Sequence, residues 1–221
     1  MQETIRQIRT RLRLAMDGAV AASMRQKGVD YKLNFGVTLP RLKEIAADFD
    51  KNAALAEELW RQNVRELKIL ATLLYPAGEF TAAKADEWVR EIRHIEIAEQ
   101  FCANLMQETP FAETSAAAWL REKSPEFILA TGFILYTRLF IKHLPVTPVH
   151  TAEFLHTAFE VLESGNFRTG QTALIALKHY GRMAPEQAEQ VLSAFEPFKA
   201  AGSVREREIY DDLQFEFEYY R

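Results

Sequence analysis

The sequence lacks most of the features that mark secreted or membrane proteins. Its single cysteine, Cys102, excludes an internal disulfide and any thiolate metal cluster, which is typical of a reducing compartment and predicts a cytoplasmic protein. The amino terminus is polar and has no apolar core of the length that a signal peptide needs. The most apolar run, residues 127–141, contains Arg138 and is shorter than the roughly 20 residues that span a bilayer. We therefore expect a buried helix there and no membrane partner.

Familiar catalytic and metal-binding motifs are missing too. The chain has no His-Glu-x-x-His, no paired cysteine motif, no Gly-x-Ser-x-Gly and no EF-hand loop. Residues 165–172 resemble a phosphate-binding loop, but Gln171 stands where such a loop needs a lysine, and a helix rather than a strand precedes it. We therefore predict no metal, no cofactor and no nucleotide, and we interpret the two glycines of this segment as parts of a helix turn.

Excess positive charge is also absent, because the formal net charge is −4. The distribution is uneven, however. Residues 1–70 hold 13 of the 27 Lys and Arg and 9 of the 31 Asp and Glu, a balance of +4, so the remaining 14 and 22 give −8. A polyanionic partner would therefore meet the amino-terminal half. The alternative is that these charges are solvated helix faces.

A tandem pair of short apolar-striped helices recurs along the chain. Residues 54–76 contain the first pair, and the helix that ends near Trp60 is echoed around Trp88 and Trp119, at spacings of 28 and 31 residues. A second apolar helix follows each echo. Because one such pair cannot bury both stripes, the pairs have to stack on one another. The predicted fold class is all-α, a HEAT-like or armadillo-like superhelix, which is a curved solenoid of antiparallel helix pairs. The alternative is a generic helical bundle.

The length of 221 residues and the hydrophobic content of 48% predict one domain over residues 1–221. The first helix is expected over residues 4–27, with arginines at positions 6, 9, 11 and 13, and the next begins at Thr38 with Pro40 in its first turn. A joint at Pro145–Pro148 divides the domain into sub-blocks of about 1–143 and 149–221.

The second sub-block has helices expected over residues 151–163, 166–180 and 185–198, and a last helix opened by the Ser203–Glu206 capping box. The buried stripe of that last helix is predicted to be Ile209, Leu213, Phe217 and Tyr220. Residues 214–219 also alternate as a strand would, which is the second interpretation.

Three segments carry a resemblance to a known family. They are residues 34–46 (NFGVTLPRLKEIA), 55–60 (LAEELW) and 66–71 (ELKILA), with fainter similarity over 173–180. Together they resemble the DNA alkylation repair glycosylases of HEAT-like fold that are usually called AlkD. The resemblance implies a concave face that holds duplex DNA, from which positively charged N3- or N7-alkylated purines are removed without a metal or cofactor.

The chemistry of that family needs a small set of groups. The leaving purine already carries positive charge, so the developing charge lies on an oxocarbenium-like sugar. A carboxylate beside the sugar, aromatic rings on the deoxyribose and an arginine on the phosphate are the implied working parts. The family's Trp and Asp fall near His94 and Ala98, its arginine near Ala130 and its second Trp near Ile175, and none of these positions matches.

A shift in register would let Glu96 or Glu99 supply the carboxylate. These two lie three residues apart and share a helix face, although the alternative is a solvated helix edge near Arg93. Glu96 and Glu99 are therefore the candidate catalytic residues. The candidate nucleic-acid-binding residues, together with the basic amino-terminal segment, are Arg41, Lys43, Arg65, Lys68, Arg93, His94, Arg168 and Lys178.

Three functional hypotheses follow. The first is a protein that binds duplex DNA on a concave basic face without the family's glycosylase activity. The second is an active alkylpurine DNA glycosylase that uses Glu96 or Glu99. The third is a non-catalytic scaffold that holds a protein partner in the concave groove, which the acidic carboxy-terminal half favours.

Overall fold

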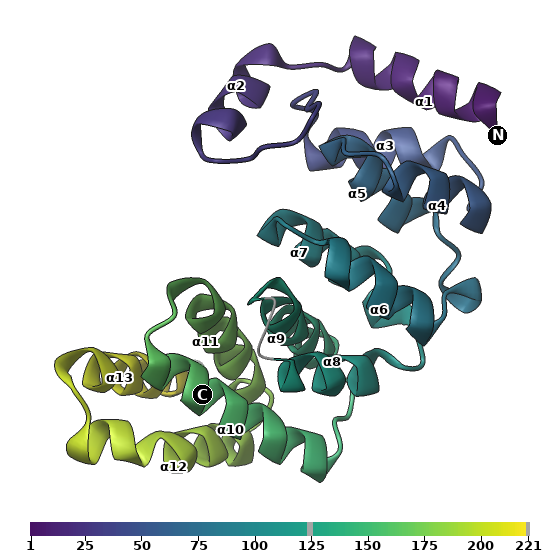
Figure 1. Ribbon diagram of the computed structural model, residues 1–221. Helices are drawn as coiled ribbons and strands as arrows, with labels where there is room; N and C mark the ends of the chain where they lie inside the picture. Colours follow the sequence, from purple (N-terminus) through teal and green to yellow (C-terminus); the bar gives the residue numbers. More distant parts are fainter. Residues whose placement is uncertain (123–125, 220–221) are drawn as a thin grey trace. The chain divides into compact units, whose positions relative to one another are not determined.

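The structure is a computed structural model that describes residues 1–122 and 126–219 (Figure 1). Those residues form helices and no strand, and an isolated bridge joins Leu33 to Val64. None of the helices in these two ranges has the length and apolar character needed to cross a bilayer. The chain divides into two compact units, Met1–Ala85 with Ala103–Thr109 and Asp86–Cys102 with Pro110–Arg221.

The first unit begins with two helices where the sequence predicted one. Asp17 separates them, because its carboxylate accepts hydrogen bonds from the backbone N–H groups of Ala19 and Val20 and thereby caps the second helix. The prediction of a single helix over residues 4–27 is therefore wrong. The helices of this unit are α1 (Gln2–Leu14), α2 (Gly18–Gln26), α3 (Leu39–Ala47), α4 (Ala53–Trp60) and α5 (Arg65–Leu74), with the short 3-10 helices η1 (Ala77–Glu79) and η2 (Met106–Glu108).

The loop between α2 and α3 is organised by a buried carboxylate. Glu66, at the start of α5, is fully buried and accepts the N–H groups of Phe35 at 3.1 Å and Val37 at 3.3 Å. The guanidinium of Arg65, which is 2% exposed, donates to Glu66 at 3.0 Å and to the carbonyl of Val37 at 2.8 Å. Gly36 turns the chain between Phe35 and Val37 at φ +72°, so the start of the 34–46 segment and Glu66 of the 66–71 segment, two of the segments that carry the family resemblance, are joined by buried hydrogen bonds.

The second unit continues the pattern of paired helices. α6 and α7 cross the boundary between the units, and the later helices lie wholly in the second. Its helices are α6 (Ala82–Glu91), α7 (Ile95–Asn104), α8 (Ala112–Arg121), α9 (Glu126–Ile141), α10 (Pro148–Ser164), α11 (Phe167–Gly181), α12 (Pro185–Ala201) and α13 (Val204–Tyr219).

The three tryptophans lie at equivalent places in successive helix pairs. Trp60, Trp88 and Trp119 belong to α4, α6 and α8, and each is 1% exposed. Within the second unit the ring of Phe101 on α7 lies 6.0 Å from Trp88 and 6.1 Å from Trp119. The indole N–H of Trp119 donates to Asp86 of α6 at 2.8 Å. Within the second unit, the echoes at Trp88 and Trp119 therefore mark the buried contact between one repeat and the next.

Surface ion pairs repeat with nearly the same period. Arg90 contacts Glu122 at 2.6 Å, and Arg121 contacts Glu153 at 2.6 Å, in both cases 32 residues along the chain. Each pair joins the end of one repeat to the following one. Exposed ion pairs of this kind contribute roughly 0–1 kcal/mol each, so they align the helices more than they stabilise them.

The carboxy-terminal segment is a helix. α13 runs through residues 214–219, so the strand interpretation is wrong. Ser203 and Glu206 exchange the predicted capping-box hydrogen bonds, at 2.5 and 3.3 Å. Leu213 and Phe217 are buried, whereas Tyr220 lies outside the described residues. A non-helical segment, residues 142–147, separates α9 from α10, and the proposed division into sub-blocks there stays a prediction.

Candidate functional site

An open groove crosses the second helices of three consecutive pairs in the second unit. It has a volume of about 530 Å3 and is formed by α7, α9 and α11. Glu99 lines it from α7, Glu126 from the first turn of α9, and Phe167, Arg168 and Ile175 from α11. The groove therefore combines exposed apolar surface with three charged side chains.

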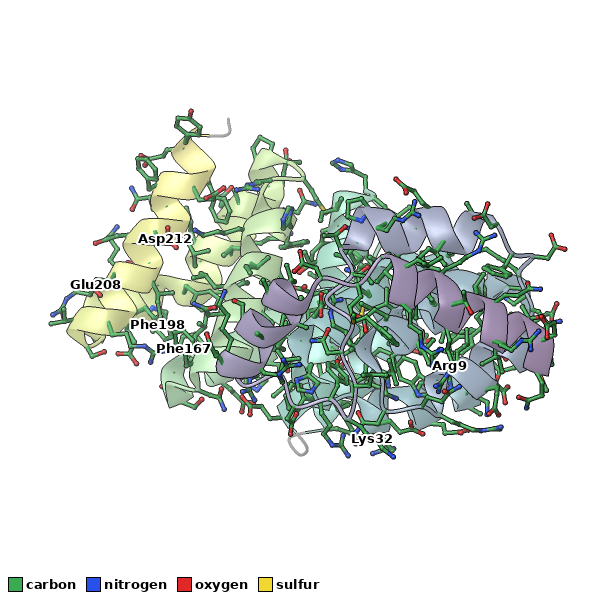
Figure 2. The ribbon with its side chains drawn as sticks, turned by 90° about the horizontal axis from the view of Figure 1, so that it is seen from above. Arg9, Lys32, Phe167, Phe198, Glu208 and Asp212 are labelled. Carbon is green, nitrogen blue, oxygen red and sulfur yellow. The ribbon has the colours of Figure 1, made fainter. Side chains whose placement is uncertain are left out.

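The apolar part of the groove is held out toward solvent by the start of α11. Gly165 ends α10 in the left-handed conformation, at φ +77°, and the side chain of Asn166 caps α11 by accepting the N–H of Thr169 at 3.2 Å. This places Phe167 at the first helical position, where it is 77% exposed (Figure 2). Ile175, two turns later, is 50% exposed. Because Phe167 and Ile175 line the same groove, they form a candidate apolar contact surface.

The charged part of the groove contains an ion pair. Arg168 lies 3.2 Å from Glu126, and its guanidinium also lies over the ring of Phe127, 4.8 Å from the ring centroid. Both interactions fix the guanidinium plane beside the start of α9. The positive charge of Arg168 is thus largely balanced inside the groove.

Glu99 is the predicted catalytic residue that the structure places in the groove. Partial burial of its carboxyl group, with the nearby Glu96 carboxylate adding to the effect, raises the pKa of Glu99 above its usual range. Glu96 is half-buried, near the start of α7, and does not line the groove. Of the two candidates, Glu99 is therefore the one that a bound molecule would meet.

Four of the eight predicted DNA-binding residues are matched with carboxylates. Arg41 contacts Glu44 at 2.5 Å and Arg65 contacts Glu66 at 3.0 Å in the first unit, and Arg168 and Lys178 are matched in the second. Lys178 lies 2.7 Å from Asp212 and 3.5 Å from Glu216. Arg65 is the extreme case, because its burial leaves no guanidinium surface for a phosphate.

The other four have different surroundings. Lys68 donates to the carbonyl of Trp60 at 2.7 Å and lies 4.3 Å from the centroid of its indole, so it braces α4 against α5. Arg93 is exposed and donates to two backbone carbonyls. His94 is half-buried at the start of α7, and Lys43 is exposed on α3 with no carboxylate partner within residues 1–122 and 126–219.

Sequence reasoning missed most of the groove. Asn166, Phe167, Gln171 and Thr172 line it and were not predicted, whereas Arg168, which also lines it, was a predicted nucleic-acid-binding residue. All five come from the segment that mimics a phosphate-binding loop. The available signal was a large apolar residue directly after an asparagine cap, which puts it on the outside of a helix start. The interpretation of both glycines as turn residues holds for Gly165 but not for Gly170, which lies inside α11.

The positions aligned with the family's catalytic groups have contrasting surroundings. Ala98 and Ala130 are fully buried, whereas Ile175 lines the groove. No group of three His, Cys, Asp or Glu that could hold a metal ion occurs in the part of the chain that the structure describes.

Residues 8–206 match the model of a protein family described as DNA alkylation repair enzyme. A solved structure, described as representing a new family of proteins related to the HEAT-like repeat DNA glycosylases with affinity for branched DNA structures, is similar in fold. The TM-score is 0.77 over 95% of this chain and 94% of that chain, at 15% sequence identity. This likeness confirms the all-α, HEAT-like helical-repeat fold predicted from the sequence. No curated protein matches the sequence.

Proposed function

The chain belongs to the DNA alkylation repair enzyme family, and from this premise we propose that it binds DNA without removing alkylated purines. In this proposal the groove on α7, α9 and α11 takes part in contact with the nucleic acid. Its exposed Phe167 offers a ring for a base, and Arg168 offers a guanidinium once its pairing with Glu126 is exchanged for a phosphate.

Burial of the tryptophans is the observation that supports the proposed lack of glycosylase activity. All three indoles of the chain are only 1% exposed, so none can pack against a deoxyribose in the groove. The groove presents a phenylalanine and an isoleucine in their place. Stabilisation of an oxocarbenium-like sugar needs preorganised groups around it, and an isolated carboxylate does not supply them.

Glu99 favours a second candidate function, an active alkylpurine glycosylase, because this carboxyl group lies in the groove. Its raised pKa weighs against that role, since partial burial and Glu96 disfavour the ionised form that would face a sugar cation. A methylated duplex incubated with excess protein distinguishes the two candidates. We expect no release of alkylpurine; release that is lost in Glu99→Gln would establish the glycosylase instead.

Branched DNA is the form that we propose the groove prefers. The similar solved structure is described as having affinity for such DNA. In an intact duplex every base is paired and stacked, so an exposed ring such as Phe167 finds no base face. At a branch point bases are unstacked more readily, and stacking on an aromatic side chain contributes roughly 1–3 kcal/mol per base.

Fluorescence anisotropy with a labelled four-way junction and a duplex of equal nucleotide number tests this preference. We expect tighter binding of the junction, and Phe167→Ala should weaken junction binding by about tenfold while duplex binding changes little. Phe215→Ala is the matched control, because Phe215 is 67% exposed on α13 and does not line the groove. Equal losses in both variants, or equal affinity for both DNAs, would contradict the proposal. A protein partner in the groove stays a prediction.

A further inference from the structure

α1 carries a row of arginines along one flank. Arg6, Arg9 and Arg13 are separated by three and four residues, so they lie on the same side of the helix and cover about 10 Å of its axis. Ile5, Ile8 and Leu12 form the buried side. The row faces a groove of about 300 Å3 whose opposite wall contains Glu58 and Gln62 from the end of α4.

The side chain that contacts Arg9 from the opposite wall is neutral. Arg9, labelled in Figure 2, donates a hydrogen bond to the side-chain oxygen of Gln62, a neutral acceptor. The amide nitrogen of Gln62 donates to the carbonyl of Glu58 at 3.1 Å. The carboxylate of Glu58, which also lines the groove, forms its ion pair with Arg61 at 3.3 Å. Gln62 therefore holds Arg9 in place without cancelling its charge.

The other two arginines of the row keep their charge as well. Arg13 is exposed and has no carboxylate partner among residues 1–122 and 126–219. Arg6 contacts Glu3 at 2.9 Å, but both side chains are more than half exposed, and such a pair is screened and readily exchanged. Up to three guanidinium groups are thus available along one line.

The opposite flank of the same helix provides a contrast. Arg11 forms an ion pair with Asp48 and lies over the ring of Phe49, 5.1 Å from the centroid. Its charge is matched and its position is fixed by packing. On α1, therefore, Arg11 is paired with a carboxylate, whereas the row of arginines on the other flank has no buried carboxylate partner in the described part of the chain. This difference argues against the interpretation of the helix as uniformly solvated.

We propose that the row of Arg6, Arg9 and Arg13 is a binding track for the phosphodiester backbone of nucleic acid, separate from the groove on α7, α9 and α11. Guanidinium groups bind phosphate oxygens through two parallel hydrogen bonds, and a duplex carries one negative charge per about 1.7 Å of its axis. The track is thus long enough to meet several phosphates. This inference rests on the proposed DNA binding.

Salt titrations of DNA binding test the track. In Arg9→Gln/Arg13→Gln, the loss of two phosphate contacts should lower the slope of log affinity against log salt by about 1.8 and the affinity by tenfold or more. Arg11→Gln is the matched control and should leave the slope unchanged, because Asp48 already neutralises Arg11. Thermal unfolding followed by circular dichroism should be the same for the double variant and the wild type.

Gln62→Glu provides an independent test that removes no arginine. The new carboxylate should neutralise Arg9 and weaken DNA binding severalfold more than Gln7→Glu, which makes the same charge change on α1 at a residue that does not line the groove. If wild type binds DNA but the double variant and Gln62→Glu behave as their controls do, the track is refuted and the proposed function stands. If the wild type binds no DNA, the track and the proposed function are both refuted. Equal competition by polyglutamate would show that an acidic protein is the ligand and would also refute the track.

Discussion

Replacement of Glu66 by glutamine is expected to lower the free energy of unfolding by about 3–5 kcal/mol, which is the usual result of removing one partner from a buried ion pair. The carboxylate is fully buried and accepts three hydrogen bonds, from the backbone N–H groups of Phe35 and Val37 and from Arg65. A glutamine has one acceptor oxygen in place of two, so one of these donors meets an NH2 group. The buried guanidinium of Arg65 then loses the negative charge of Glu66.

Urea unfolding followed by circular dichroism measures this loss. The midpoint should fall while the slope of free energy against urea stays the same. Glu58→Gln is the control, because it breaks an exposed pair with Arg61 at 3.3 Å and should cost about 1 kcal/mol or less. A loss below about 1 kcal/mol in Glu66→Gln would mean that water reaches the pair, and would refute the reasoning.

Three further outcomes are expected. Partial burial and Glu96 raise the pKa of Glu99, so the folded state binds the carboxyl proton more tightly than the unfolded state does. Stability therefore falls as pH rises from the ordinary pKa of about 4.5 through the raised pKa of the folded state. Glu99→Gln should raise the melting temperature at pH 7 and have little effect below pH 4.5. Gly36→Ala should destabilise the protein, because φ is +72° and the added Cβ would lie 2.8 Å from the backbone nitrogen of Ala21, with urea unfolding as the measurement. Burial raises the pKa of the Cys102 thiol, so Ellman's reagent should react only after unfolding.

Most of the fold could be predicted because its signals are local and periodic. Each tryptophan echo marks the first helix of a pair, and Trp60, Trp88 and Trp119 are each buried there. The division of residues 4–27 into two helices was missed, although Asp17 followed by Gly18 is a capping signal. Apolar periodicity outweighed it, since positions 5, 8 and 12 continue a helical stripe up to the break.

The candidate site was less predictable because its residues come from three helices. Glu99 could be identified from its helix face, but its neighbours Phe167 and Arg168 are about 70 residues further along the chain. Nothing local to residues 165–172 shows that the segment opens onto a groove. Burial of Arg65 was equally hidden, because its partners Glu66 and Val37 come from different elements of the first unit.

A count of basic residues also misjudges the charge that a polyanion would meet. Lys178 is matched by Asp212 and Glu216, which lie 34 and 38 residues away, so a cation counted in the sequence can be neutral in effect once the repeats stack. Whether the charge of such an arginine is neutralised depends on the side chain that faces it across the helix interface. Asp48 occupies that place opposite Arg11, and Gln62 occupies it opposite Arg9. The flank of α1 where the facing side chain is an amide is therefore one place where the excess of +4 over residues 1–70 reaches the surface as net positive charge.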